Sequence, residues 1–90
     1  MLNRVMEVLR VGPDRRLYQV SLGENYGLVE MVSDGSIPLP DDRDRALGSP
    51  DVQAFLEGWL MTDGVLLGSA HPPHLRWDDL CRFVPRACNV

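Results

Sequence analysis

The chain has 90 residues, of which 44% are hydrophobic and 24% charged, and these ordinary values predict one folded domain over residues 1–90 and argue against disorder of the whole chain. Thirteen acidic and nine basic residues give a net charge of −4, which disfavours general phosphate binding because that needs a basic face. All nine basic residues are arginine, so no lysine can serve as a nucleophile or form a Schiff base.

Residues 4–11, 16–22 and 27–33 are predicted to form the three strands of a β-meander. The first segment is rich in valine, the second alternates in hydrophobicity, and the third is a short apolar run. The sequences GPDR and GENYG between them contain the residue types that form tight turns.

Residues 2–11 are also open to a helical interpretation. Four apolar residues recur there at helical spacing, namely Leu2, Val5, Met6 and Leu9. Asn3 suits the start of such a helix, and Gly12-Pro13 would end it. The three valines and the turn that follows favour a strand, and we adopt that prediction.

Residues 36–50 are predicted to be a connection, because four Pro or Gly residues interrupt any regular element there. Asp41, Asp42 and Asp44 lie within it and raise the question of a metal-binding loop. The calcium-loop pattern of acidic positions, a central glycine and a terminal glutamate is absent. We therefore interpret DDRDR as a solvated loop whose charges partly neutralise one another.

A helix is predicted to begin at Pro50, with Ser49 as its N-cap. Its apolar stripe, at i, i+3, i+4, i+7 and i+8, consists of Val52, Phe55, Leu56, Trp59 and Leu60. Asp63-Gly64 ends the helix. Gly58, inside it, marks either a close approach of the helix to the sheet or a position on the surface.

A short buried strand is predicted at residues 65–69, and a last helix at residues 76–84, after Pro72-Pro73 and before Pro85. The stripe of the last helix consists of Trp77, Leu80, Cys81 and Val84. The predicted fold is therefore α+β, in the order β-β-β-α-β-α, with two helices packed against a small antiparallel meander of three strands plus one short strand.

Both histidines and both cysteines fall in the last twenty residues, as His71, His74, Cys81 and Cys88. These are ligand types of a structural zinc site, but the usual close pair of cysteines is missing. The helical stripe already explains Cys81 as a small buried hydrophobe. A disulfide is disfavoured because two helical turns hold the Cα atoms about 10 Å apart, unless the helix ends early at Pro85. We favour no metal and no cofactor.

No nucleophile elbow and no Gly-rich phosphate loop is present, so we predict that the chain is not an enzyme. An alternative function is nucleic-acid binding by Arg15 and Arg16 together with two tyrosines of the predicted sheet, Tyr18 and Tyr26. The acidic balance of the chain disfavours this alternative.

The favoured function is protein–protein binding by a regulator, an inhibitor or immunity-type protein, or an adaptor. Arginine, tryptophan and tyrosine are the residue types enriched at interface hot spots, and Arg15, Arg16, Tyr18 and Tyr26 are the predicted contact residues. A protein partner is expected, and a homodimer fits as well. The composition is typical of a GC-rich bacterium or its phage. The first residues lack the apolar core of a signal peptide, and no segment is apolar enough to span a membrane, so we expect a cytoplasmic protein.

Overall fold

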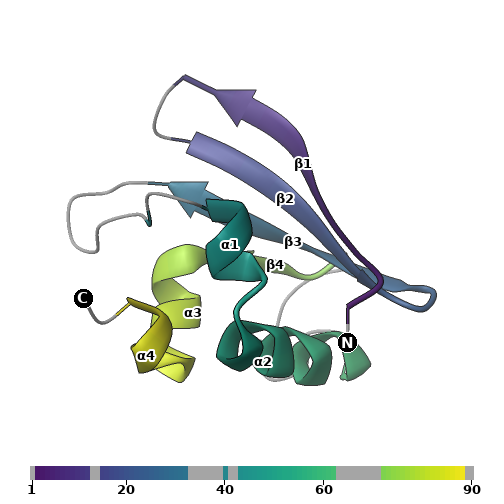
Figure 1. Cartoon of the computed structure of the whole chain (residues 1–90). Helices are drawn as coiled ribbons and strands as arrows, with labels where there is room; N and C mark the ends of the chain where they lie inside the picture. Colours follow the sequence, from purple (N-terminus) through teal and green to yellow (C-terminus); the bar gives the residue numbers. More distant parts are fainter. Residues whose placement is uncertain (1, 13–14, 33–39, 41–42, 63–71, 89–90) are drawn as a thin grey trace.

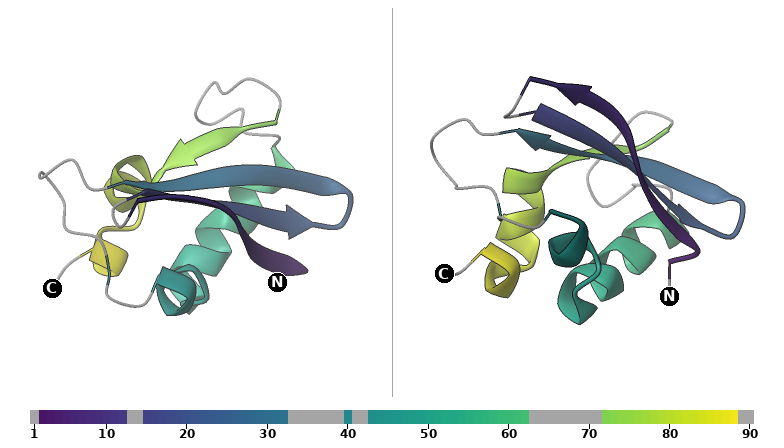
Figure 2. Two further views of the ribbon diagram at one scale, coloured as in Figure 1. Left: turned by 90° about the horizontal axis from the view of Figure 1, so that it is seen from above. Right: turned by 45° about the horizontal axis from the view of Figure 1, so that its top comes forward.

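The protein folds into two layers, a β-sheet on one side and helices on the other (Figure 1). The computed structural model describes residues 2–12, 15–32, 40, 43–62 and 72–88. Two further views confirm that the described helices lie on the same side of the sheet (Figure 2).

The sheet has four strands in the order β1-β2-β3-β4. They are β1 (Arg4–Val11), β2 (Arg15–Leu22), β3 (Asn25–Val32) and β4 (His74–Arg76). The first three are antiparallel neighbours, and β4 runs parallel to β3. The predicted meander is therefore confirmed, including the strand interpretation of the first segment. The fourth strand lies just before the last helices, and the strand predicted at residues 65–69 lies outside the described residues.

Glycines at both turns of the meander adopt backbone angles that other residues rarely adopt. Gly12 has φ 66° and Gly23 has φ 62°, so each glycine provides the left-handed conformation that reverses the chain. The Gly23 amide also donates a hydrogen bond to Oδ1 of Asn3. Asn3, the residue before the edge strand β1, thus closes the second turn instead of capping a helix.

Four helical segments pack on one face of the sheet: α1 (Arg43–Leu47), α2 (Pro50–Met61), α3 (Trp77–Phe83) and α4 (Pro85–Cys88). The prediction of two helices was right for α2 and α3. It was wrong in treating all of the connection as loop, because α1 lies within it. None of the described helices is both long and apolar enough to cross a membrane.

Tertiary contacts explain the short helix α1. Leu47 is fully buried, and its carbonyl accepts a 3.1 Å hydrogen bond from Nε2 of Gln53 in α2. Ser49 occupies the predicted N-cap of α2, but its hydroxyl makes no cap hydrogen bond and donates to the carbonyl of Ala46 at 3.0 Å. Ser49 therefore fixes the end of α1 rather than the start of α2.

The core lies between the sheet and the helices α2 and α3. Its largest fully buried side chains are Trp59, Trp77, Tyr18, Met31, Leu47, Leu56, Leu60, Leu75, Leu80, Val20, Val29 and Val52. Four of the five stripe residues of α2 are buried, and the fifth, Phe55, is only partly buried. The predicted stripe thus identifies the face that packs on the sheet.

At Gly27 of β3, α2 packs so closely on the sheet that a side chain would not fit. A Cβ atom at this position would lie 2.7 Å from two ring carbons of Trp59, closer than real Cβ contacts come. Gly58, in contrast, has nothing within 4 Å of its hypothetical Cβ. Of the two interpretations of Gly58, the surface position is the one found, and the close approach belongs to a glycine of the sheet.

Candidate functional site

The two faces of the sheet differ in what covers them. Successive side chains of a strand point to opposite faces, and Tyr18, Val20 and Val29 point into the core beneath the helices. We call the other side the open face, since none of the described helices packs on it (Figure 1). By the strand register, the open face consists of Arg4, Met6, Leu9 and Val11 of β1, Arg15, Leu17, Gln19 and Ser21 of β2, Tyr26, Leu28, Glu30 and Val32 of β3, and His74 and Arg76 of β4.

The open face carries exposed apolar side chains, two of them close together in β1 and a third, Tyr26, toward the other end of β3. Leu9 is 52% and Val11 is 53% exposed, and Tyr26 of β3 is 38% exposed. Leu9 and Val11 line a small depression of about 60 Å³ together with Leu17, Arg15, Glu30 and His74. Exposed apolar residues gathered on one face mark an interaction surface more often than scattered ones do.

A buried carboxylate lies in the same depression of the open face. Glu30 is only 9% exposed, although it lies on the face that no described helix covers. Its Oε2 is 2.6 Å from Nε of Arg15, and its Oε1 is 3.2 Å from Nε2 of His74. A buried carboxylate needs such partners, because an unpaired buried charge is strongly unfavourable. The three residues form a polar cluster beside the apolar side chains.

Sequence reasoning did not select Glu30. The signal was available, since it is the one charged residue in the apolar run LVEMV of β3. A charge inside a buried strand indicates a specific partner. The partners, however, come from two other strands, and neither local pattern nor spacing identifies them.

The four predicted contact residues do not form one surface. Arg15 and Tyr26 lie on the open face but near opposite ends of the sheet, opposite Val32 and Ser21 respectively. Arg16 and Tyr18 lie on the helix-covered side. The contact role of these residues stays a prediction.

The residues on the helix-covered side also have partners there. Tyr18 is 1% exposed and belongs to the core. Nε of Arg16 lies 3.6 Å from Oε1 of Glu7 in β1. Arg15 pairs with Glu30, so both arginines predicted to bind nucleic acid lie next to carboxylates. The nucleic-acid alternative therefore gains no support from their placement.

The proposed zinc ligands are not brought together in the part of the chain that is described. His71 lies outside it, and His74 pairs with Glu30. Within that part, no group of three or more His, Cys, Asp or Glu side chains is arranged to hold a metal ion. Cys81 is bonded in a disulfide, so its sulfur is not a free thiolate ligand.

The disulfide corrects the prediction that Cys81 is a free thiol. That prediction assumed one continuous helix to residue 84, which would separate the two cysteines by two turns. The structure ends α3 at Phe83 and begins α4 at Pro85, so the chain changes direction before Cys88, the only other cysteine in the sequence. The early helix end at Pro85 thus removes the geometric objection to a disulfide.

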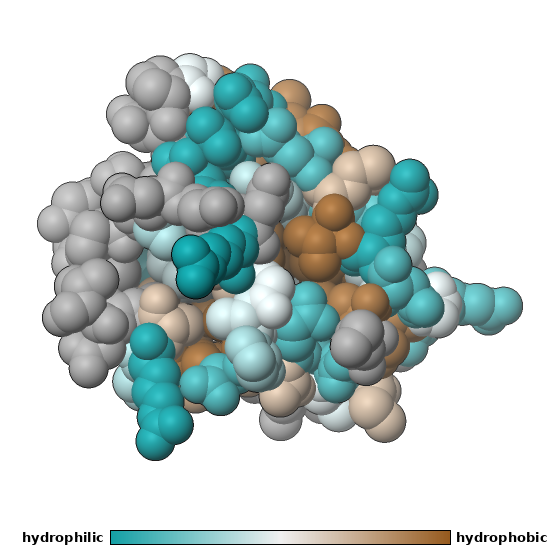
Figure 3. Space-filling model, viewed as in Figure 1, coloured by the Kyte–Doolittle hydropathy of each residue, from teal (hydrophilic) through white to brown (hydrophobic). Residues whose placement is uncertain are grey.

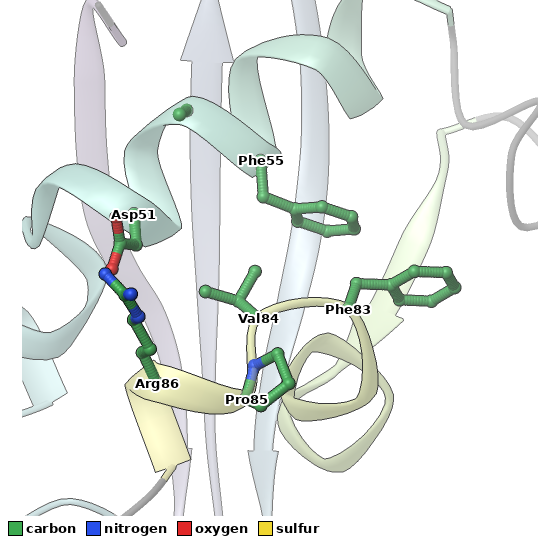
Figure 4. A pocket seen from close by; sticks show the side chains of 7 residues that line it. Asp51, Phe55, Phe83, Val84, Pro85 and Arg86 are labelled. Carbon is green, nitrogen blue, oxygen red and sulfur yellow. The ribbon is translucent and has the colours of Figure 1, made fainter.

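A second apolar feature lies between α2 and the last two helices (Figure 4). The rings of Phe55 and Phe83 stack with centroids 5.3 Å apart, beside a pocket of about 380 Å³. Asp51 and Arg86 point toward one another across its other side (Figure 4). The side chains that line it include no serine, cysteine or histidine.

The surface seen from the side of Figure 1 is mixed in character. Hydrophobic residues reach it in separate spots between hydrophilic ones (Figure 3). A face of this kind is ordinary for a folded protein, which leaves the open face of the sheet as the more distinctive surface.

Comparison with known proteins identifies no relative: no family model, no curated protein and no solved structure matches the chain. Function must therefore be argued from the geometry of the site.

Proposed function

We propose that this chain is a non-catalytic protein-binding module that contacts its partner through the open face of the sheet. The supporting observation is the asymmetry of the sheet: one face packs on the helices, whereas the other presents Leu9 and Val11 to solvent. Exposed apolar side chains next to satisfied polar groups are typical of protein interfaces.

The polar cluster supports the same proposal. Arg15 is 57% and His74 is 48% exposed in their side chains, yet both are held by the buried carboxylate of Glu30. Polar side chains that are already held in place lose little conformational freedom when a partner binds. An arginine beside an apolar patch is also a frequent hot-spot residue. The open face itself carries three arginines and one glutamate, so charge complementarity there favours a partner with an acidic surface, although the net charge of the whole chain is −4.

The test is capture of a partner from the native host, followed by binding of the purified pair. Wild-type chain is compared with Leu9→Asp and Tyr26→Asp, which place a charge on the open face at exposed positions. Met61→Asp is the control, because Met61 is an exposed apolar residue at the end of α2, away from the open face.

We expect the partner to bind wild type and the Met61 variant, and to lose at least about tenfold in affinity for the open-face variants, as expected when a hot-spot contact is removed. The proposal fails if all three variants bind alike, or if the purified chain captures no protein at physiological salt. Binding that weakens steeply with salt and requires DNA or RNA would support the nucleic-acid alternative instead.

The proposal includes a role as a regulator, an inhibitor or immunity-type protein, or an adaptor, in the cytoplasm of a bacterium or in a phage-infected cell. The disulfide of Cys81 makes the location testable, because the cytoplasm normally keeps thiols reduced. Alkylation of free thiols in intact host cells, followed by mass spectrometry, distinguishes the two states. A fully oxidised Cys81 in the cell would contradict the cytoplasmic location.

A further inference from the structure

The edge strand β1 has the features of a strand that pairs with another chain. It is eight residues long and lies at one end of the sheet, whereas β4, at the other end, has three residues. Three exposed apolar side chains belong to it: Val8, Leu9 and Val11. In the described part of the chain, no strand pairs with its outer side. A long apolar edge strand offers its backbone N–H and C=O groups to a further strand.

A β-bulge determines which residues of β1 share a face. The register with β2 shifts between Glu7 and Leu9, which makes Val8 the extra residue. In a regular strand, residues three apart point to opposite faces. Across the bulge, Glu7 and Arg10 both lie on the helix-covered side. Met6 and Val11 are also separated by an odd number of positions, and the bulge likewise places both of them on one face, the open face.

This arrangement favours one register for a second copy. In a symmetric antiparallel pair, directly opposite residues must lie on the same face. A two-fold axis at the bulge satisfies this condition and sets Glu7 opposite Arg10 of the second copy, twice by symmetry. It also sets Met6 opposite Val11. Both pairs are favourable across strands, one by opposite charge and one by apolar contact.

Other registers are worse for identifiable reasons. An axis at Glu7 sets two carboxylates directly opposite each other, and an axis at Arg10 does the same with two guanidinium groups. An axis at Met6 keeps the faces matched but pairs only residues 4–8, which leaves Leu9 and Val11 exposed. Like charges directly opposite each other destabilise strand pairing, so charge complementarity selects the bulge-centred register.

We propose that a second copy of this chain adds to β1 with the two-fold axis at Val8 and Leu9, and that Glu7 of each copy pairs with Arg10 of the other. The two strands pair on both sides of the axis, and the apolar side chains of the two bulges pack around it. Glu7 and Arg10 already form a 3.1 Å ion pair within one chain, and in the dimer these charges are shared between copies. The proposal uses the edge of the sheet, whereas partner binding uses its open face; Leu9 and Val11 belong to both surfaces, and the charges of Glu7 and Arg10, on the helix-covered side, belong to the dimer contact alone.

Charge exchange provides the test. Glu7→Arg and Arg10→Glu, made singly, each set like charges opposite one another at both symmetric positions. We expect wild type to form dimers as concentration rises into the high-micromolar range in analytical ultracentrifugation. Each single variant should raise the dissociation constant by roughly tenfold or more. An equimolar mixture of the two single variants should form a 1:1 heterodimer in native mass spectrometry, because each supplies the charges that the other needs.

The controls keep the test decisive. Asp79→Arg and Arg82→Glu change a similar exposed i, i+3 pair on α3 and should leave the dimer unchanged. Thermal melting verifies that each variant folds, and Val8→Asp tests the same axis if a variant at position 7 or 10 does not fold. A wild type that stays monomeric at every concentration, single variants that dimerise like wild type, or a mixture that does not associate would each overturn the proposal. Partner capture by the monomeric variants remains a separate measurement.

Discussion

Replacing Gly27 with alanine tests how α2 packs on the sheet. The added methyl group would lie 2.7 Å from ring carbons Cη2 and Cζ3 of Trp59 and 3.1 Å from Cδ2 of Leu60. Both residues are fully buried, so neither side chain can turn into solvent. The indole ring must shift, and α2 must shift with it.

The magnitude follows from two opposing contributions. Overpacking a core by one methyl group costs about 1–3 kcal/mol, whereas alanine gains about 0.5–1 kcal/mol over glycine inside a strand. The net loss for Gly27→Ala therefore lies between about 0 and 2.5 kcal/mol, with a central value of about 1.2 kcal/mol. In a domain of this size each kcal/mol lowers Tm by about 4–8 °C.

Gly58→Ala is the matched control, because its methyl group meets nothing within 4 Å. It should raise the stability of the helix by up to about 1 kcal/mol. The assay is chemical denaturation followed by tryptophan fluorescence, since Trp59 and Trp77 are both buried, with thermal melting by circular dichroism alongside. A Gly27 variant more stable than wild type, or a Gly58 variant less stable than wild type, would refute this description of the helix–sheet packing.

Three further predictions concern stability. Reduction of the disulfide of Cys81 should lower the free energy of unfolding by about 2–4 kcal/mol. The Cys81→Ser variant should lose a similar amount, and reductant should not change its stability further. Equal melting curves of wild type with and without reductant would contradict this prediction. Leu47→Ala, at a fully buried position, should lose about 2–5 kcal/mol, whereas Met61→Ala, at an exposed one, should stay within about 0.5 kcal/mol of wild type in the same denaturation assay. Glu30→Gln should lower the free energy of unfolding by about 1 kcal/mol. The value is modest because the neighbouring guanidinium and imidazole groups are half exposed. A variant more stable than wild type would show that the buried charge is a net cost.

Local sequence patterns predict well those helices and strands whose apolar residues recur with a regular period and whose ends are marked by turn or capping residues. The alternation of β2 and the helical stripe of α2 were both sufficient for a correct assignment. The segment of β1 was ambiguous for a physical reason: the bulge at Val8 interrupts the two-residue period. Once the period is broken, four apolar residues fall at helical spacing by coincidence, and only pairing with β2 resolves the choice.

The elements that the sequence did not predict depend on distant contacts. The helix α1 has five residues, too few for a periodic pattern, and its end is held by Gln53 and Ser49. The strand β4 has three residues and pairs with β3, more than forty positions earlier in the chain. The disulfide of Cys81 depends on where α3 ends. For the candidate site, Arg15 and Tyr26 were among the contact residues predicted from the sequence. The distance between them, and the position of Tyr18 in the core, depend on the strand register, which local patterns do not show.

The cluster around Glu30 connects the stability of the fold to the character of the open face. Three register pairs and the 2.9 Å hydrogen bond from the Leu28 amide to the carbonyl of Pro73 join β4 to β3. A strand this short gains little from backbone pairing alone. Glu30 adds a side-chain connection by binding His74 of β4 and Arg15 of β2 at once. The same pairing holds Arg15 and His74 beside Leu9 and Val11, because all of these side chains line one depression on the open face, so the cluster that secures β4 also determines which polar groups lie next to the exposed apolar ones.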